Sequence, residues 1–211
     1  VVDFLQSQVN SGELAESEKV SIPNLMITFS GEKRLQDFVS TKMRNPSTSE
    51  GEKLLFLDVI SRCPLKELPG EWIRLLENSL QEENMMIRSK VLDLMVSRSI
   101  PELDQDLVKI IENPQTAPSF KLKALGAGIT SHPELSDSQF NVLLDFLQPE
   151  NESPIRQSAV RLLVQAQLND SQLLKLAENE IPVADIFLLP GLVSAFEDSR
   201  SEEVGEALIK A

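Results

Sequence analysis

The residues most capable of chemistry gather around His132, the only histidine in the chain. Ser131, Ser136 and Asp137 lie close to it in sequence, and a hydroxyl, an imidazole and a carboxylate are the groups of a nucleophilic triad. A triad needs a nucleophile, a base and an oxyanion site that separate elements hold in place. These residues instead share one turn beside Pro133. We therefore interpret His132 as a loop histidine and predict no catalytic residue.

Cys63 is the only cysteine. One thiol can form neither an internal disulfide nor a cysteine-based metal cluster, and a structural zinc ion needs four ligands. Gly126 and Gly128 resemble two glycines of a dinucleotide-binding loop, but Ser131 occupies the place of the third and no strand is predicted before them. We predict that these glycines let two helices approach closely. We also predict that the chain is not an enzyme and holds no metal or cofactor.

Acidic residues dominate the charge of the chain. It carries 20 basic and 33 acidic residues, a formal net charge of −13. From residue 101 onward, 18 acidic residues stand against 8 basic ones. Such a field repels the phosphates of nucleic acids and of anionic membranes, and no apolar stretch reaches the roughly 18 residues of a membrane-spanning helix. We predict no nucleic-acid partner, no membrane insertion, and a basic or neutral partner for the acidic half.

These side chains must be positioned by helices, because one helical pattern recurs four times. It reads WIRLLEN at 72–78, LVKIIEN at 107–113, FNVLLDF at 140–146 and LLKLAEN at 173–179, and DSQ precedes the last two copies. Apolar residues at the first, fourth and fifth positions form one face of a helix. We predict that this face is buried in every copy. Its members are Trp72, Leu75, Leu76, Leu107, Ile110, Ile111, Phe140, Leu143, Leu144, Leu173, Leu176 and Ala177.

A second helix is predicted before each of these copies, at 52–62, 86–98, 120–131 and 154–166. Capping residues lie shortly before the helices of the recurring pattern, and we expect the Asp or the Ser of DSQ to cap the two helices that follow it. Aromatic residues make up only 5% of the chain. A core of leucine, isoleucine, valine and alanine suits helix-on-helix packing, so the sequence predicts an all-α protein.

Two helices per 33–35 residues, with an apolar residue and a cation early in the first helix, resemble the HEAT-repeat family of α-solenoids. The resemblance covers about residues 50–211 and implies a right-handed α-solenoid of about five HEAT-like helix pairs. We expect residues 1–49 to form an atypical, partly irregular helical cap, because the terminal units of solenoids differ from the rest. The cations are Arg88, Lys121 and Arg156, and the expected repeats span about 50–83, 84–117, 118–152, 153–183 and 184–211.

Two polar columns accompany the apolar face, at the third and sixth positions of the pattern. At about 100° per residue they point away from the core. Basic and acidic residues three apart stabilise a helix by only a few tenths of a kcal/mol, so an ordinary solvated face is one interpretation. The other is a charge ladder that docks an extended partner. The candidate partner-binding residues of this ladder are Arg74, Glu77, Lys109, Glu112, Asp145, Lys175 and Glu178.

HEAT arrays generally act as interaction scaffolds, so the resemblance implies a non-enzymatic module that binds another protein or neighbouring domains of its parent chain. Residues 187–211 also resemble, more weakly, the HEAT region of large multidomain bacterial proteins that carry a dehydrogenase-like propeller and a c-type haem domain. A rigid spacer between the domains of such a redox protein is therefore an alternative, and an enzyme of helical-repeat fold is another. We expect a fragment of a longer protein, cytoplasmic or periplasmic.

Overall fold

The computed structural model describes residues 1–10 and 16–211. All regular elements in these residues are helices, and the one strand-like pairing among them is an isolated parallel bridge between Glu134 and Gln167. This confirms the predicted all-α class. The chain divides into two compact units, Val1–Asp106 and Leu107–Ala211.

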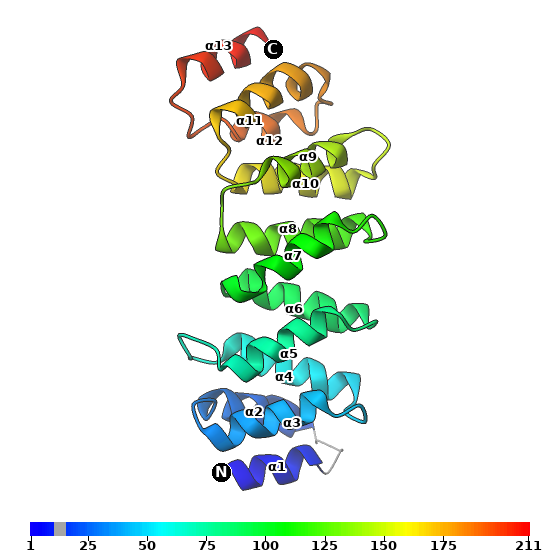
Figure 1. Ribbon diagram of the computed structural model, residues 1–211, viewed down its shortest axis with the longest axis vertical. Coiled ribbons are helices and arrows are strands. Elements are labelled where there is room, and N and C mark those ends of the chain that lie inside the picture. The colour runs from blue at the N-terminus through cyan, green and yellow to red at the C-terminus, as the bar shows by residue number, and fades with distance from the viewer. Residues whose placement is uncertain (11–15) are drawn as a thin grey trace. The chain divides into compact units, whose positions relative to one another are not determined.

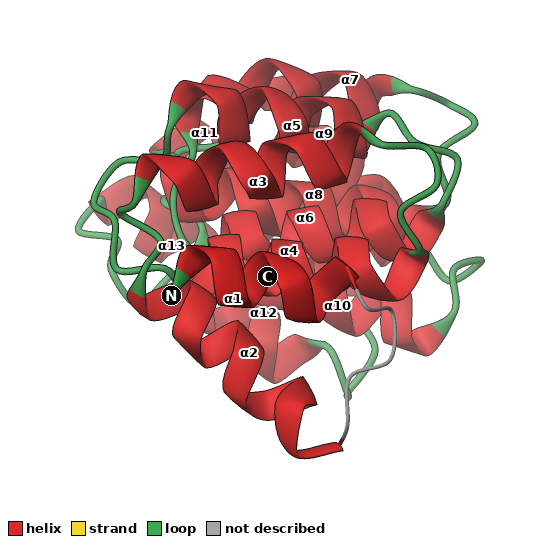
Figure 2. Ribbon diagram, turned by 90° about the horizontal axis from the view of Figure 1, so that it is seen from below, coloured by secondary structure: helices red, strands yellow, loops and turns green. Residues whose placement is uncertain are grey.

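The helices of the first unit form two layers. Helix α4 packs against α2 and α6 in one layer, whereas α3 and α5 pack against each other in the second. Figure 2 shows α3 and α5 together on one side of α4 and α6. Helix α1 packs against α2 and α3. The bounds are α1 (Val2–Asn10), α2 (Glu16–Thr28), α3 (Lys33–Arg44), α4 (Glu50–Arg62), α5 (Gly70–Leu80), α6 (Met85–Ser97) and the 3-10 turn η1 (Pro101–Leu103).

The second unit has the same kind of packing. Helix α10 packs against α8 and α12 in one layer. It also packs against α9, which precedes it in the chain, and α11 packs against α13 (Figure 1). The bounds are α7 (Asp104–Glu112), which begins before the unit, α8 (Pro118–Ser131), α9 (Asp137–Leu147), α10 (Ser153–Gln165), α11 (Asp170–Lys175), the π-helix η2 (Leu176–Glu180), the 3-10 turn η3 (Ile181–Val183), α12 (Leu189–Ser194) and α13 (Glu202–Lys210).

The apolar face predicted from the recurring pattern is buried in all four copies. These copies lie in α5, in α7, in α9, and in α11 with η2. Every one of the twelve predicted residues is buried, from Trp72 to Ala177. Burial of such faces is the main source of helix stability in a folded protein, because isolated helices of this length are marginal in water.

Residues 1–49 contain α1, α2 and α3, and residues 11–15 of the expected N-terminal cap lie outside the described part of the chain. Leu35 and Val39 of α3 are fully buried. Phe38 packs edge-on against Phe56 of α4, with the ring centroids 6.1 Å apart. Helix α3 therefore contributes to the core of the first unit.

The repeated phrase DSQ begins a helix in both copies, but its Asp and Ser are not the caps. Ser136 caps α9 and Asn169 caps α11, and each lies one residue before DSQ. The glutamine of the phrase completes a capping box, because its side chain accepts a hydrogen bond from the amide of the cap residue. The prediction of a helix start was right and the choice of cap was wrong, since a capping box places its Glu or Gln three residues after the cap.

Gln172 also joins the two copies of the phrase to each other. Its Nε2 donates to the carbonyl of Leu135 at 3.0 Å and to Oδ1 of Asp137 at 3.3 Å. In the turns that precede the two copies, the amide of Gln167 donates to the carbonyl of Pro133 at 2.8 Å. The buried side chain of Gln172 therefore satisfies the cap of its own helix and a carbonyl of the preceding copy.

The helices are irregular where the expected repeats 153–183 and 184–211 meet. The α-helical part of α11 ends at Lys175, and the chain continues as the π-helix η2 and the turn η3. Pro182 has no amide hydrogen and its ring clashes with the preceding turn, so it cannot extend an α-helix. Helix α12 begins only at Leu189, where Pro190 suits the first turn.

Gly191 lies in the contact between α12 and α10. A Cβ atom at this position would be 2.5 Å from Cγ1 of the buried Val160. We expect Gly191→Ala to lower the free energy of unfolding by about 1–2 kcal/mol, because overpacking outweighs the gain in helix propensity. Urea unfolding followed by circular dichroism measures the change.

Gly205→Ala is the matched control, because a Cβ atom at this position of α13 meets nothing within 4 Å. It should be neutral or stabilise the protein by up to about 1 kcal/mol. The double substitution Gly191→Ala with Val160→Ala should lower the free energy of unfolding by less than the two single substitutions do in sum. The smaller residue at position 160 removes the clash. Equal effects of the two glycine substitutions would contradict close packing at Gly191.

Candidate interaction surfaces

The structure places all seven residues of the predicted charge ladder on the solvent side of their helices. Arg74 and Glu77 belong to α5 of the first unit, and the other five lie in the second. All seven side chains are exposed, which confirms the direction predicted for the two polar columns. The pairing within the columns differs from the prediction, as Arg74 and Lys175 show.

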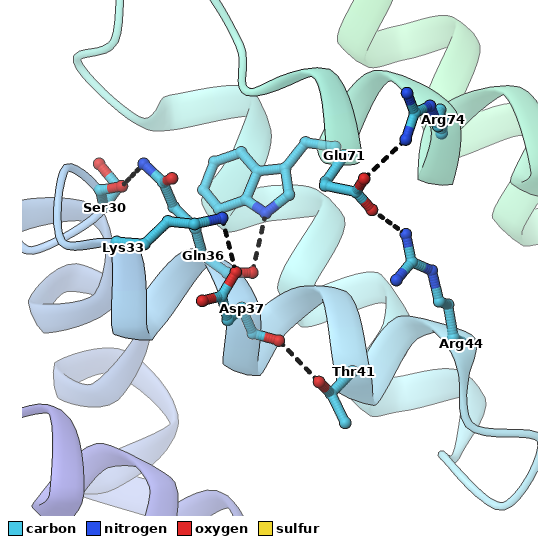
Figure 3. Close-up of polar contacts among 9 residues, drawn as sticks. Ser30, Lys33, Gln36, Asp37, Thr41, Arg44, Glu71 and Arg74 are labelled. Carbon is cyan, nitrogen blue, oxygen red and sulfur yellow. Dashed lines mark hydrogen bonds and ion pairs between the residues drawn. The ribbon is translucent and has the colours of Figure 1, made fainter.

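Arg74 pairs with Glu71, not with Glu77 as the spacing predicted. Its Nη1 lies 2.7 Å from Oε1 of Glu71. Figure 3 shows that Arg44, at the end of α3, approaches the same carboxylate from the other side and donates to Oε2. The hydrogen bond from Arg44 and the charges of both arginines hold the pKa of Glu71 below its usual range. This cluster links α3 to α5 at the surface.

Trp72, the one tryptophan, is fully buried beneath this surface. Its indole Nε1 donates to the carbonyl of Gln36 in α3 at 3.3 Å. The side chain of Gln36 in turn donates to the carbonyl of Ser30, and Lys33 pairs with Asp37 one turn along α3 (Figure 3). Trp72 is therefore a packing residue with a satisfied polar atom, which agrees with its place in the apolar column.

In the second unit, Lys175 donates to Oδ1 of Asn141 at 2.7 Å and lies 6.0 Å from the ring centroid of Phe140. Lys175 and Asp145 both act on Glu180, the last residue of η2. Burial raises the pKa of Glu180, the charge of Lys175 opposes this shift, and the charge of Asp145 adds to it. Two residues of the predicted ladder thus influence the ionisation of a carboxyl group outside the ladder.

Glu180→Gln should stabilise the protein at neutral pH by less than about 1 kcal/mol, because the ionised carboxylate is partly desolvated. The pKa of Glu180 is raised on folding, so its ionisation penalty is complete above the folded pKa. The penalty disappears as the pH falls toward the ordinary value of 4.5. Urea midpoints at pH 7 and pH 4 should show a gain only at pH 7. Glu178→Gln, at an exposed site in the same π-helix, is the control.

The residues around His132 have structural roles. Oγ of Ser136 accepts the hydrogen bond that caps α9, and Oδ1 of Asp137 accepts from Gln172. His132 is the exposed C-cap residue of α8. The described residues contain no group of three or more His, Cys, Asp or Glu side chains that could hold a metal ion.

Cys63 is buried at the end of α4, next to Arg98 of the loop after α6. The guanidinium group donates to Sγ of Cys63 at 3.2 Å, to the carbonyls of Ile60 and Cys63 at 3.0 and 3.2 Å, and to the carbonyl of Leu65. Arg98 thereby satisfies carbonyls that α4 leaves open where it ends.

Three large apolar side chains are exposed on one short segment that runs from the last residue of η3 toward α12. Val183, Ile186 and Phe187 keep 77%, 78% and 84% of their surface in contact with solvent. This apolar stretch was predicted to begin the last repeat. The spacing of Pro182 and Pro190 is the sequence signal that could have corrected this prediction. In the structure, Ile186 and Phe187 lie between these prolines and outside any α-helix.

The segment is held in one conformation by Asp185. Its Oδ1 accepts from the amides of Phe187 and Leu188 at 2.9 and 3.1 Å, and its Oδ2 lies 2.7 Å from Nη2 of Arg156. Arg156 also donates from Nε to the carbonyl of Leu147. Burial alone would raise the pKa of Asp185, but these hydrogen bonds and the charge of Arg156 hold it below its usual range. Phe187 is therefore displayed on an ordered turn.

No helix in the described residues has the length and apolar character needed to cross a membrane. The chain was also compared with protein families, curated proteins and solved structures. No family model, curated protein or solved structure matches it. The case for a function therefore depends on the geometry of the two units.

Proposed function

We propose that the chain is a non-enzymatic interaction scaffold built as a HEAT-like α-solenoid. Support for the architecture comes from the two helix layers within each unit and from the burial of the apolar columns in all four copies. The hydrogen bond from Gln172 to Asp137 in the preceding copy of the phrase also supports this architecture, because repeats in a solenoid are stabilised by contacts with their neighbours.

The main support for a binding function is the exposed turn that contains Val183, Ile186 and Phe187. Scattered apolar residues are normal on a protein surface, whereas a cluster of large ones suggests an interaction site. Here the cluster is also fixed in place by Asp185 and Arg156. Aromatic residues presented on a rigid support are typical of the centres of protein interfaces. The partner is another protein or a neighbouring domain of the parent chain.

Site-specific photocrosslinking tests this function. A benzophenone amino acid at position 187 should form crosslinks to one defined partner in cells, and Ile186→Asp should abolish them by placing a charge in the contact. The same probe at position 150, in the exposed loop after α9, is the control and should give no such product. Equal labelling from both positions would contradict a binding surface at Phe187.

A rigid spacer is the second candidate, and the surface cluster of the first unit favours it. Arg44, Glu71 and Arg74 satisfy one another across α3 and α5. Arg74 of the ladder is thus already paired within the first unit, which makes it less available to a partner. The absence of any specific crosslink from position 187 would favour the spacer over the scaffold.

A further inference from the structure

A groove of about 480 Å³ lies in the second unit between α13 and the segment of α11, η2 and η3. Leu174, Ala177 and Pro182 contribute apolar surface from one side, and Ala207 does so from α13. Carboxylates from both sides border this surface. We propose that the groove binds an arginine- or lysine-rich segment of a partner protein. This inference rests on the scaffold function proposed above and adds the chemistry of the partner.

The charges at the groove are mainly negative and only partly compensated. Glu178 comes from η2, whereas Glu203 and Glu206 come from α13. Lys210 is the single cation among the lining side chains, and it pairs with Glu206 at 3.0 Å. Within the described residues, no hydrogen bond or ion pair engages the carboxylates of Glu178 and Glu203. Two exposed carboxylates therefore remain available on opposite sides of the groove.

An apolar surface with carboxylates at its border matches the two parts of a long basic side chain. The methylene groups of arginine and lysine pack on apolar surface while the charged end stays at the border in water. Arginine can also donate two parallel hydrogen bonds to a carboxylate. The net charge of −13 draws a basic segment toward the chain, and it repels an acidic one.

Titration of the full 211-residue chain with a defined peptide tests the groove. The probe is an acetylated, amidated octapeptide of alternating arginine and alanine, in about 50 mM salt, where screening is weak. Amide NMR shifts should change in two stretches, 174–182 and 203–211. The substitutions Glu178→Gln and Glu203→Gln together should raise the dissociation constant about three- to tenfold, since each exposed ion pair contributes modestly.

The control changes the same charge elsewhere in the second unit. Glu150→Gln with Glu152→Gln alters two exposed carboxylates that do not line the groove, and it should change the dissociation constant less than twofold. Equal weakening by both pairs, or shifts spread over every acidic surface, would overturn the groove and indicate general attraction to an acidic chain. The scaffold function would survive that result, because it depends on crosslinks from position 187.

Discussion

Arg98→Met is expected to lower the free energy of unfolding of the first unit by about 3 kcal/mol. Methionine keeps an apolar stem but has no donors, so the carbonyls of Ile60, Cys63 and Leu65 lose a charged hydrogen-bond partner. Bonds to charged groups are worth about 1.5–3 kcal/mol, and a buried carbonyl left without a partner adds to the loss. Trp72 is the only tryptophan and lies in this unit, so its fluorescence during urea unfolding reports the change.

Arg98→Lys should recover only a small part of the loss. A lysine ammonium is a compact charge and cannot reproduce the planar fork that reaches several acceptors at once. Arg74→Met, at an exposed site in α5, is the control and should change stability by less than about 0.5 kcal/mol. If Arg98→Met had as small an effect as the control, Arg98 would not stabilise the end of α4.

Gln172→Glu is expected to lower the free energy of unfolding of the second unit by about 2–3 kcal/mol at pH 7. The carboxylate can still accept the amide of Asn169, but it cannot donate to the carbonyl of Leu135. It also brings a buried negative charge to Asp137, which accepts from Gln172 in the structure. An unpaired buried carbonyl and a like-charge contact both oppose folding. Urea unfolding followed by circular dichroism measures the loss.

Gln139→Glu is the matched control, because Gln139 occupies the same place in the capping box of α9. Glutamate serves this box as well as glutamine does, so stability should change by less than about 0.5 kcal/mol. The loss in Gln172→Glu should shrink as the pH falls, because the protonated carboxyl can again donate to Leu135. A pH-independent loss, or similar losses in the two variants, would contradict a bond between the motif copies.

Periodicity alone predicted the helices and the buried columns. Residues such as Trp72, Leu143 and Leu173 recur at helical spacing, and the burial of one face follows directly from that spacing. The exposure of the ladder was predicted for the same reason. The pairing partner of each charged residue was not predicted, because a flexible side chain can reach several neighbours. Arg74 therefore pairs with Glu71 and not with Glu77.

Features that depend on contacts between distant residues were missed. The role of Arg98 requires the end of α4 to lie beside it, and sequence spacing does not show this. A hint was present, since Arg62 and Arg98 each precede a proline turn, and Arg62 likewise reaches the side chain of Asn24, 38 residues earlier. The exposed turn at Phe187 was missed because apolar composition suggests burial. Its conformation is set by Asp185 and Arg156, 29 residues apart in sequence.

The three capping boxes found in residues 1–10 and 16–211 differ in one chemical respect. Those of α9 and α11 close on the amide groups of Gln139 and Gln172, which do not titrate. The box of α4 closes on Glu52, whose pKa is held below its usual range chiefly by the hydroxyl of Ser49. Stability from Glu52 is complete above pH 4.5 and is lost as the pH falls through its lowered pKa. Acidification should therefore fray the start of α4 first. An acid protease should cut the chain near residue 49 before it cuts at the starts of α9 and α11, where the capping box ends in a glutamine.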